Sequence, residues 1–381
     1  MWKRRLFWGV WLLVAILLYF FENNSGTRAL LLVSAVLPAG SIVCAVLSQK
    51  RLTHSFCMPK ECKKNAVVEC DVRVKGLLPC ALFYGCVEAL NRLTAEKTLL
   101  EVWVSAFSDK KAFSLSTSHC GTINISIAEG YVQDWFGLWR SSPVRYAPEY
   151  LTVLPDIFLP EVTIADGESA FAEGERWSAT RSGSDPSETF AIREYMQGDP
   201  IRQIHWKLSQ KTGTTMLREL GLSTVEQTIL LLDTTMSERG IDAAAMSAAV
   251  ETIISLSYAL TAAKIVHSVG WKNRILDELE LYEIHTEPKY ALMCERILTA
   301  SCAFDNESIC ACFQKWSGGN MYAHTVICAP TPPPDIVSIC TGGRVMLLLS
   351  GGKLFDAALG DIHVTTYCPE NAGEELKYIK I

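Results

Sequence analysis

Two apolar runs stand near the start of the sequence. Residues 6–21 are sixteen uncharged, almost wholly apolar residues, and residues 29–47 are nineteen more, interrupted only by small residues and Pro38. A helix that crosses a bilayer needs about 20 residues, with a lower limit near 17. The second run meets this length, and the first meets it when Trp2 and the apolar stems of the following basic side chains are counted. The pattern predicts a two-helix membrane hairpin over residues 1–51.

A cleaved signal peptide is the alternative for the first run, because that run also follows a basic start. The residues that end it, Phe20-Phe21-Glu22-Asn23, offer no small-residue cleavage site. A second apolar run follows within eight residues. The hairpin is therefore the favoured prediction.

The basic residues beside the two runs predict their orientation. Lys3, Arg4 and Arg5 precede the first run, and Lys50 and Arg51 follow the second. Positive charge gathers on the cytoplasmic side of membrane helices. We therefore expect a two-pass protein of the cell membrane that contacts lipid through residues 1–51 and holds the bulk of its chain in the cytoplasm.

Residues 52–157 follow a period of two. Apolar and charged residues alternate without a break over residues 68–75, and the pattern recurs over residues 100–104 and 122–127. Alternation of this kind indicates strands buried on one face, and several such strands with turns between them predict an antiparallel β-sandwich. Residues 158–190 contain seven acidic and two basic residues with no core face, which predicts an acidic linker or long loop.

The pattern changes again over residues 223–381. Residues 228–232 are a short apolar run that ends at Asp233, as expected of a strand buried on both faces. An alanine-rich stretch with helical periodicity follows, and residues 322–328 and 344–350 are further apolar runs. Alternating strands and helices predict a doubly wound α/β domain with a mostly parallel sheet.

Composition limits the classes of function. The 381 residues are 49% hydrophobic and carry a formal net charge of −6, which excludes a wholly disordered chain and argues against nucleic-acid binding. The fourteen cysteines include no C-x-x-C pair, so no zinc site is indicated. Neither the serine-hydrolase motif G-x-S-x-G nor the nucleotide-binding motif G-x-x-x-x-G-K occurs.

One segment carries a longer motif. Residues 192–207 read Ile-Arg-Glu-Tyr-Met-Gln-Gly-Asp-Pro-Ile-Arg-Gln-Ile-His-Trp-Lys, and a glycine and a glutamate follow at matching distances. This pattern resembles the signature of the bacterial domain-of-unknown-function-58 family, R-x-Y-x-x-G-D-x-x-R-x-I-x-W-x-x-S-A-R-x-G…V-x-E. The residues that we assign to this signature, and to an interaction site, are Arg193, Tyr195, Gly198, Asp199, Arg202, His205, Trp206, Lys207, Gly213 and Glu219.

Two further stretches resemble the same family. Residues 134–140 are similar to its D-P-F-G-L segment, and residues 151–155 to its strand ending in V-x-P. The sequence departs from the family at Trp135, which replaces the proline, and at Lys211, which replaces the arginine of S-A-R. A lysine is a point charge without the planar fork of arginine, which weakens any two-point recognition of an anion there.

The resemblance implies a fold and a function. Family members are similar to membrane-anchored proteins with a von Willebrand factor A-like C-terminal domain, commonly encoded near MoxR-type AAA+ ATPases. We therefore expect a membrane-anchored, non-catalytic protein-interaction or assembly factor that acts with such an ATPase. The signature segment, residues 191–222, is expected at the domain junction, where Trp206 would pack one domain against the other. A basic surface for docking a partner is the alternative.

The end of the apolar run at residue 232 is a candidate metal site. Asp233, Thr235 and Ser237 follow the D-x-S/T-x-S pattern that opens a metal-ion-dependent adhesion site, and their oxygens suit Mg²⁺. The other interpretation is a strand end whose hydroxyls cap the next helix. We expect no cofactor, with Mg²⁺ the one candidate, so that a Mg²⁺-dependent adhesion-type binder is the alternative function. A hydrolase that uses His205 with Asp199 lacks a recognisable nucleophile and is less favoured.

Overall fold

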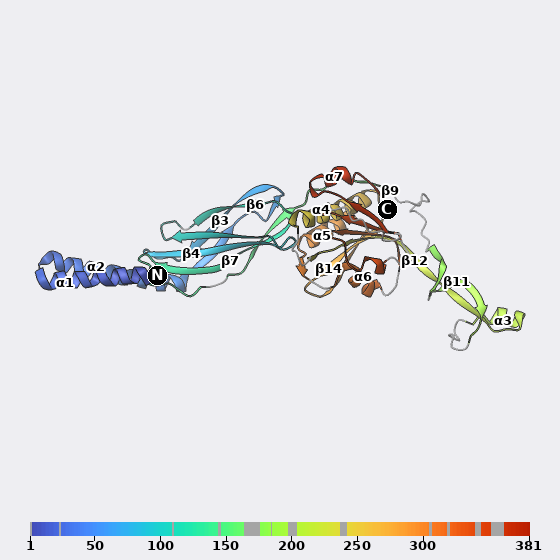
Figure 1. The fold of residues 1–381 in the computed structure, drawn as a ribbon, viewed down its shortest axis with the longest axis horizontal. Coiled ribbons are helices and arrows are strands. Elements are labelled where there is room, and N and C mark those ends of the chain that lie inside the picture. Colours follow the sequence, from blue (N-terminus) through green and yellow to red (C-terminus); the bar gives the residue numbers. More distant parts are fainter. Residues whose placement is uncertain are drawn as a thin grey trace. The chain divides into compact units, whose positions relative to one another are not determined.

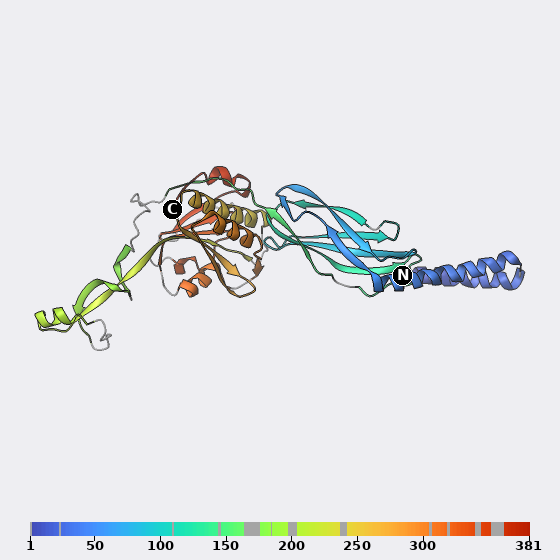
Figure 2. The same cartoon turned by 180° about the vertical axis from the view of Figure 1, so that it is seen from behind.

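The computed structural model describes residues 2–22, 24–108, 110–143, 146–163, 176–183, 185–196, 204–236, 242–304, 307–317, 321–339, 344–351 and 362–381. The chain divides into two compact units, Met1–Asp156 and Ile157–Ile381. Figure 1 gives the element labels, and Figure 2 shows the same ribbon from behind.

Two apolar helices begin the first unit. Helix α1 spans Trp2–Glu22 and helix α2 spans Ser25–Arg51, with Asn24 capping the second. Both helices are long and apolar enough to cross a membrane, and only 6% and 22% of their most apolar windows are buried. This confirms the two predicted apolar helices and is consistent with membrane anchoring.

The rest of the first unit consists of two sheets. Their strands are β1 Thr53–Cys57, β2 Glu61–Lys63, β3 Ala66–Lys75, β4 Ala81–Asn91, β5 Lys97–Ser105, β6 Lys110–Thr117, β7 Gly121–Asp134 and β8 Glu149–Leu154. One sheet has the order β1-β3-β6 and the other β2-β8-β7-β4-β5. All pairs are antiparallel except β2 with β8, where the expectation of a wholly antiparallel sandwich is wrong. Alternate residues such as Val72, Phe83 and Ile125 are fully buried in one core shared by both sheets.

The second unit is built on one mixed sheet of order β15-β14-β12-β17-β18-β19. Its strands are β12 Met216–Leu232, β14 His267–Asn273, β15 Glu278–Ile284, β17 Met321–Ala329, β18 Arg344–Leu349 and β19 Ile362–Thr366. β12, β14, β17, β18 and β19 run parallel, whereas β15 turns back along β14 as an antiparallel edge. The apolar run from Thr228 to Leu232 pairs with a strand on each side, which explains its lack of polar alternation.

Helices cover both faces of this sheet (Figures 1 and 2). Helices α4 Ala243–Ala262 and α5 Glu287–Leu298 lie on one face and α6 Ile309–Ser317 on the other. The remaining short elements are β9 Glu161–Thr163, β13 Thr235–Met236, β16 Ala303–Phe304, η2 Ile336–Ile339, η3 Pro369–Asn371, α7 Ala372–Glu375 and β20 Tyr378–Lys380. Helix α4 is also apolar enough to cross a membrane, but 78% of its most apolar window is buried. Its composition reflects packing against protein on several sides.

An arm projects from the α/β body of the second unit (Figure 1). It consists of β10 Arg176–Gly183, β11 Asp185–Glu194, the short helix α3 Trp206–Thr212 and the first part of β12. Both β10 and β11 pair antiparallel with β12. The expectation of a linker over residues 158–190 therefore fails where β9, β10 and β11 form, because neighbouring strands satisfy their backbone groups without an apolar face.

The signature segment is removed along the chain from the boundary between the two units. That boundary falls between Asp156 and Ile157, whereas residues 191–222 belong wholly to the second unit and its arm. The indole of Trp206 is 63% exposed, so the predicted burial of Trp206 between domains is wrong. The sequence pattern could not distinguish a tryptophan buried between domains from one exposed on a binding surface, because a large aromatic side chain suits both positions.

Candidate functional site

The tip of the arm is held together by polar residues of the signature segment. His205 caps helix α3, its Nδ1 accepting a hydrogen bond of 3.3 Å from the backbone N–H of Leu208. The hydroxyl of Ser209 accepts the backbone N–H of Met216 at 2.8 Å and donates to the His205 carbonyl at 3.1 Å, which ties the helix to β12. Gly213 ends the helix with a φ of 75°, in the left-handed region. These residues have structural roles at the tip.

Other residues of the tip are left in water. Trp206 and Met196 are 63% and 67% exposed, and the side chains of Lys207 and Lys211 are exposed as well. Neither lysine forms an ion pair with another residue in the part of the chain that the structure describes. The indole of Trp206 and the ammonium groups of both lysines are therefore exposed, and none of the hydrogen bonds that hold the tip together uses them.

The remaining predicted signature residues have different outcomes. Tyr195 is half-buried and its backbone N–H donates to the Thr215 carbonyl at 2.8 Å. Arg193 pairs with Leu217, and Glu219 with Ala191, in the ladder between β11 and β12. Gly198, Asp199 and Arg202 lie outside the described residues. His205 uses its Nδ1 atom to cap helix α3. Because Asp199 lies outside the described residues, the predicted pairing of His205 with Asp199 lies outside them as well.

The second candidate lies at the carboxyl-terminal edge of the mixed sheet. Asp233 ends β12 and is 4% exposed; its backbone N–H donates to the Cys328 carbonyl, and its Oδ1 accepts the backbone N–H of Thr235 at 2.9 Å. Burial raises the pKa of Asp233, while hydrogen bonds from Thr235 and the charge of Arg274 act against that rise. This edge is where open α/β sheets bind ligands.

Arg274 was not singled out by the sequence and is the cation of this edge. It follows β14 directly, and the parallel pairing of Leu232 with Trp271 brings the ends of both strands together. Its Nη2 donates to the hydroxyls of Thr235 at 3.1 Å and Thr234 at 3.3 Å. The signal that would have found it is a basic residue at the end of the strand next to Asp233.

These contacts do not fit a Mg²⁺ ion. The hydroxyl of Thr235, which would be a metal ligand, already accepts a hydrogen bond from the guanidinium of Arg274, and that positive charge lies beside the carboxylate of Asp233. A dication there would meet Coulomb repulsion in a poorly hydrated place. Ser237 lies outside the described residues, within which no three His, Cys, Asp or Glu side chains gather as a metal-binding group. The predicted metal site is therefore not supported by the residues present.

A buried lysine stands next to Arg274. Lys272 is 3% exposed, and its ammonium lies 2.7 Å from Glu307 and 2.9 Å from Asp277. Lys315 contacts the second oxygen of Glu307. Hydrogen bonds from these two lysines lower the pKa of Glu307. The network joins β14 to α6, and its charges are used within the protein.

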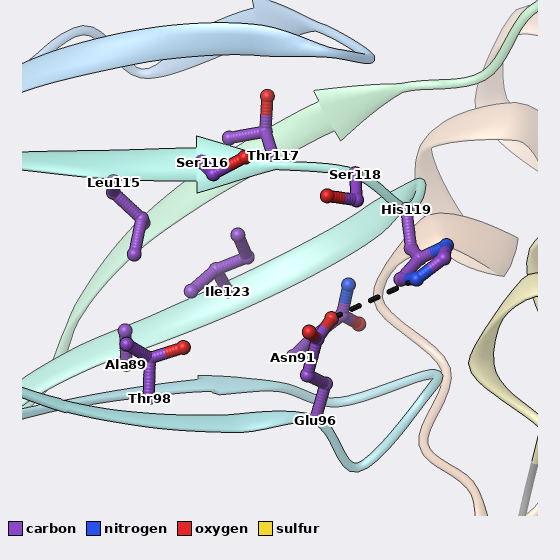
Figure 3. Close-up of a pocket in the computed structure, with 10 residues that line it drawn as sticks. All are labelled: Ala89, Asn91, Glu96, Thr98, Leu115, Ser116, Thr117, Ser118, His119 and Ile123. Carbon is purple, nitrogen blue, oxygen red and sulfur yellow. Dashed lines mark ion pairs between the residues drawn. The ribbon is translucent and has the colours of Figure 1, made fainter.

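The first unit contains a small pocket at the end of its sheets where β4, β5, β6 and β7 turn (Figure 3). His119 and Glu96 lie 3.9 Å apart at its rim. The side chain of Asn91 is engaged with backbone groups: its amide donates to the Cys120 carbonyl at 3.1 Å and its oxygen accepts the N–H of Leu93 at 3.0 Å. The pocket is thus framed by turn-forming contacts rather than by groups arranged for chemistry.

Comparison with known proteins identifies a family and a weak structural likeness. Residues 191–270 match the family model described as protein of unknown function DUF58, a segment that contains both the arm tip and Asp233. A cohesin module of a family 33 glycoside hydrolase from Clostridium perfringens is similar over 27% of this chain and 96% of its own, at 8% identity and a TM-score of 0.21. At that TM-score the likeness says nothing further. The search of the curated proteins found no match.

Proposed function

Since the chain belongs to the DUF58 family through residues 191–270, we propose that it is a membrane-anchored, non-catalytic protein-interaction or assembly factor. The single observation that carries the proposal is the exposure of Trp206 at the tip of the arm. We propose that the surface formed by Met196, Trp206, Lys207 and Lys211, the tip surface, contacts the partner.

The division of labour at the tip supports this choice. His205, Ser209 and Gly213 build the tip through backbone hydrogen bonds and a left-handed turn. Trp206 could be replaced by a polar residue without loss of any of those contacts. Tryptophan is among the residues that contribute most to binding when they become buried at an interface. An indole that is exposed in the free protein, as that of Trp206 is, can become buried when a partner binds.

The charges of the tip surface bear on the kind of partner. Lys207 and Lys211 lie one helical turn apart on α3, so their ammonium groups favour an acidic protein surface. A MoxR-type AAA+ ATPase is the partner that the family resemblance implies. We propose that the acidic docking surface belongs to such an ATPase.

We also propose that the second unit is a von Willebrand factor A-like domain. Its five parallel strands, its helices on both faces and the position of Asp233 at the end of the central strand support this assignment. The basic residues on both flanks of the helical hairpin support a cytoplasmic location for the β-sandwich and the second unit. Reporter fusions at the carboxyl terminus would contradict this location if they were active outside the cytoplasm.

The binding proposal is tested with the full chain in lipid nanodiscs and a purified MoxR-type ATPase from the same organism. We expect Trp206→Ala to weaken binding at least about thirtyfold, the effect of losing an interface residue worth about 2 kcal/mol. Trp103→Ala is the matched control, because Trp103 is 56% exposed on a strand of the first unit. Equal affinity of both variants and the wild type would exclude the tip surface as the contact.

A further inference from the structure

The loops at the two ends of the β-sandwich differ in character. The loops at one end, described at residues 76–80, 106–108, 135–143 and 146–148, include exposed or half-buried apolar residues such as Leu77, Phe107 and Trp135. At the opposite end the turns around Asn65, 92–96 and 118–120 are mostly polar. The rings of Phe107 and Trp135 lie 5.9 Å apart although Phe107 is 74% and Trp135 46% exposed.

The apolar end is the one that contacts the helical hairpin. The Arg5 guanidinium donates from Nε to the Leu138 carbonyl at 2.8 Å, and the rings of Trp8 and Phe136 meet edge to face at 4.7 Å. On α2 the hydroxyl of Ser41 donates to the Cys80 carbonyl at 2.9 Å and accepts the backbone N–H of Trp135 at 3.1 Å. These contacts show which part of each helix lies against the sandwich: the first turns of α1, at Arg5 and Trp8, and the part of α2 at Ser41.

The length of helix left beyond these contacts is short for a bilayer. At 1.5 Å per residue, the stretch from Arg5 to Glu22 rises roughly 26 Å and the stretch from Ser25 to Ser41 roughly 24 Å. The hydrocarbon core is about 30 Å thick. Glu22 at the end of α1 and Asn24 at the cap of α2 are polar, so this end of the hairpin needs water. If the hairpin crosses the bilayer, the opposite boundary of the hydrocarbon must therefore fall at the level of Ser41 or below it.

We infer that the apolar end of the sandwich is a membrane-contacting surface, with Phe107 and Trp135 inserted in the interfacial region of the bilayer. Aromatic side chains favour that depth because an apolar body and a polar edge are both satisfied there. Backbone groups at this end are already satisfied by side chains of the helices, as burial near hydrocarbon demands. Gly137 permits the close approach: its φ is 70°, and an added Cβ would stand 2.9 Å from the Arg4 side chain.

The inference rests on the proposed membrane anchoring and is tested separately from it. The full chain is reconstituted in vesicles of phosphatidylcholine and phosphatidylglycerol with brominated acyl chains, which quench tryptophan fluorescence on contact. We expect Phe107→Trp to add emission that is blue-shifted and largely lost in the brominated vesicles. We expect Trp135→Phe to remove a lipid-quenched component, whereas Trp316→Phe, which removes an equally exposed indole of the second unit, removes none.

The possible outcomes distinguish failure of the membrane-contacting surface from failure of the membrane anchor. Trp11→Phe, within α1, reports on the anchor. If this change removes a lipid-quenched component, but the tryptophan introduced at position 107 and the native Trp135 are quenched only by aqueous iodide, the membrane-contacting surface is wrong and the anchor stands. If brominated lipid quenches no component from Trp11 either, the anchor itself fails and this inference with it. Phe107→Trp retains a large aromatic residue at an exposed position, so a fold-preserving variant is available for the decision.

Discussion

The sheet edge and the arm tip of the second unit both carry charged and aromatic residues, but those at the edge are buried and paired whereas Trp206 and the lysines at the tip are exposed. At the edge, Asp233 and Lys272 are 4% and 3% exposed, and each is met by hydrogen bonds or opposite charges. At the tip, Trp206 is 63% exposed, and its ring has no stacking partner among the residues that the structure describes. Buried charges are costly unless they are paired, so folding requires the arrangement at the edge. The exposure of Trp206 is not required by folding, and it is the observation on which the proposed partner surface rests.

The largest expected effect lies in the core next to the sheet edge. Trp271 is 1% exposed and stacks on Tyr282 at 5.3 Å. Trp271→Ala should destabilise the second unit by about 3–5 kcal/mol, because it empties a large aromatic site. Thermal unfolding of the detergent-solubilised chain should show a melting temperature lower by roughly 10 °C. A loss no greater than that of Trp206→Ala would remove the contrast between the two regions.

A smaller, pH-dependent effect is expected at His267. This residue is fully buried, with its ring nitrogens bonded to the Ser257 hydroxyl at 2.8 Å and the Ile265 carbonyl at 2.9 Å, and burial lowers its pKa. The unfolded chain therefore takes up a proton near pH 6.5 that the folded state refuses. Stability should be complete above that pH and fall as pH decreases below it, by at most about 1.4 kcal/mol per pH unit.

The control for this titration is His267→Gln. It should be less stable than the wild type at pH 8 but lose less on acidification, so the two stability curves converge between pH 7 and 5. Parallel curves over that range would show that His267 does not titrate on unfolding. Comparing the two proteins at each pH cancels the contributions of other groups, such as His54, whose pKa burial also lowers.

At the arm tip, substitution should hardly change stability. Trp206→Ala is expected to alter the free energy of unfolding by less than about 0.5 kcal/mol, as for other surface positions without a folding contact. The same melting experiment measures it, with Trp271→Ala as the reference for a buried indole. A loss of several kcal/mol would mean that the ring is covered in the folded chain and would undermine the tip surface as a partner site.

The smallest effect concerns Mg²⁺ at the sheet edge. Because Arg274 already supplies a positive charge to Thr234 and Thr235, millimolar Mg²⁺ should leave the melting temperature of the wild type unchanged. A site filled at 100 times its dissociation constant would instead stabilise the fold by about 2.7 kcal/mol. Such a stabilisation, lost in Asp233→Asn, would make the metal-dependent binder the leading function in place of the assembly factor.

The sequence predicted those parts of the molecule whose burial is periodic. Alternation over residues 68–75 identified β3, and the unbroken apolar run before Asp233 identified the central strand of the mixed sheet. The two N-terminal helices followed from apolar length alone. That criterion is also met by α4, which is buried in protein. The length of an apolar run shows that a helix is shielded from water, but it does not show whether lipid or protein surrounds the helix.

The arm and the sheet-edge cation could not be predicted in the same way. The strands of the arm satisfy one another through backbone pairing, which leaves no hydrophobic period in residues 176–194. The position of Arg274 beside Thr235 can be inferred only when β14 is known to pair with β12, because the two residues are about forty positions apart in the sequence. For the candidate site, the signature residues were found but their exposure was not, because exposure depends on the rest of the fold.

Strand β12 has a mechanical consequence. It runs without interruption from Met216 at the arm to Leu232 at the centre of the mixed sheet, roughly 55 Å of extended chain. Its inner end pairs with β14 on one side and β17 on the other over Thr228–Leu232. Hydrogen bonds between strands lie across the strand direction, so a pull on the arm along β12 loads them all together instead of opening them one by one. A force applied at the tip along β12 would therefore be shared by all of these hydrogen bonds, and the arm and the sheet would resist it as one body.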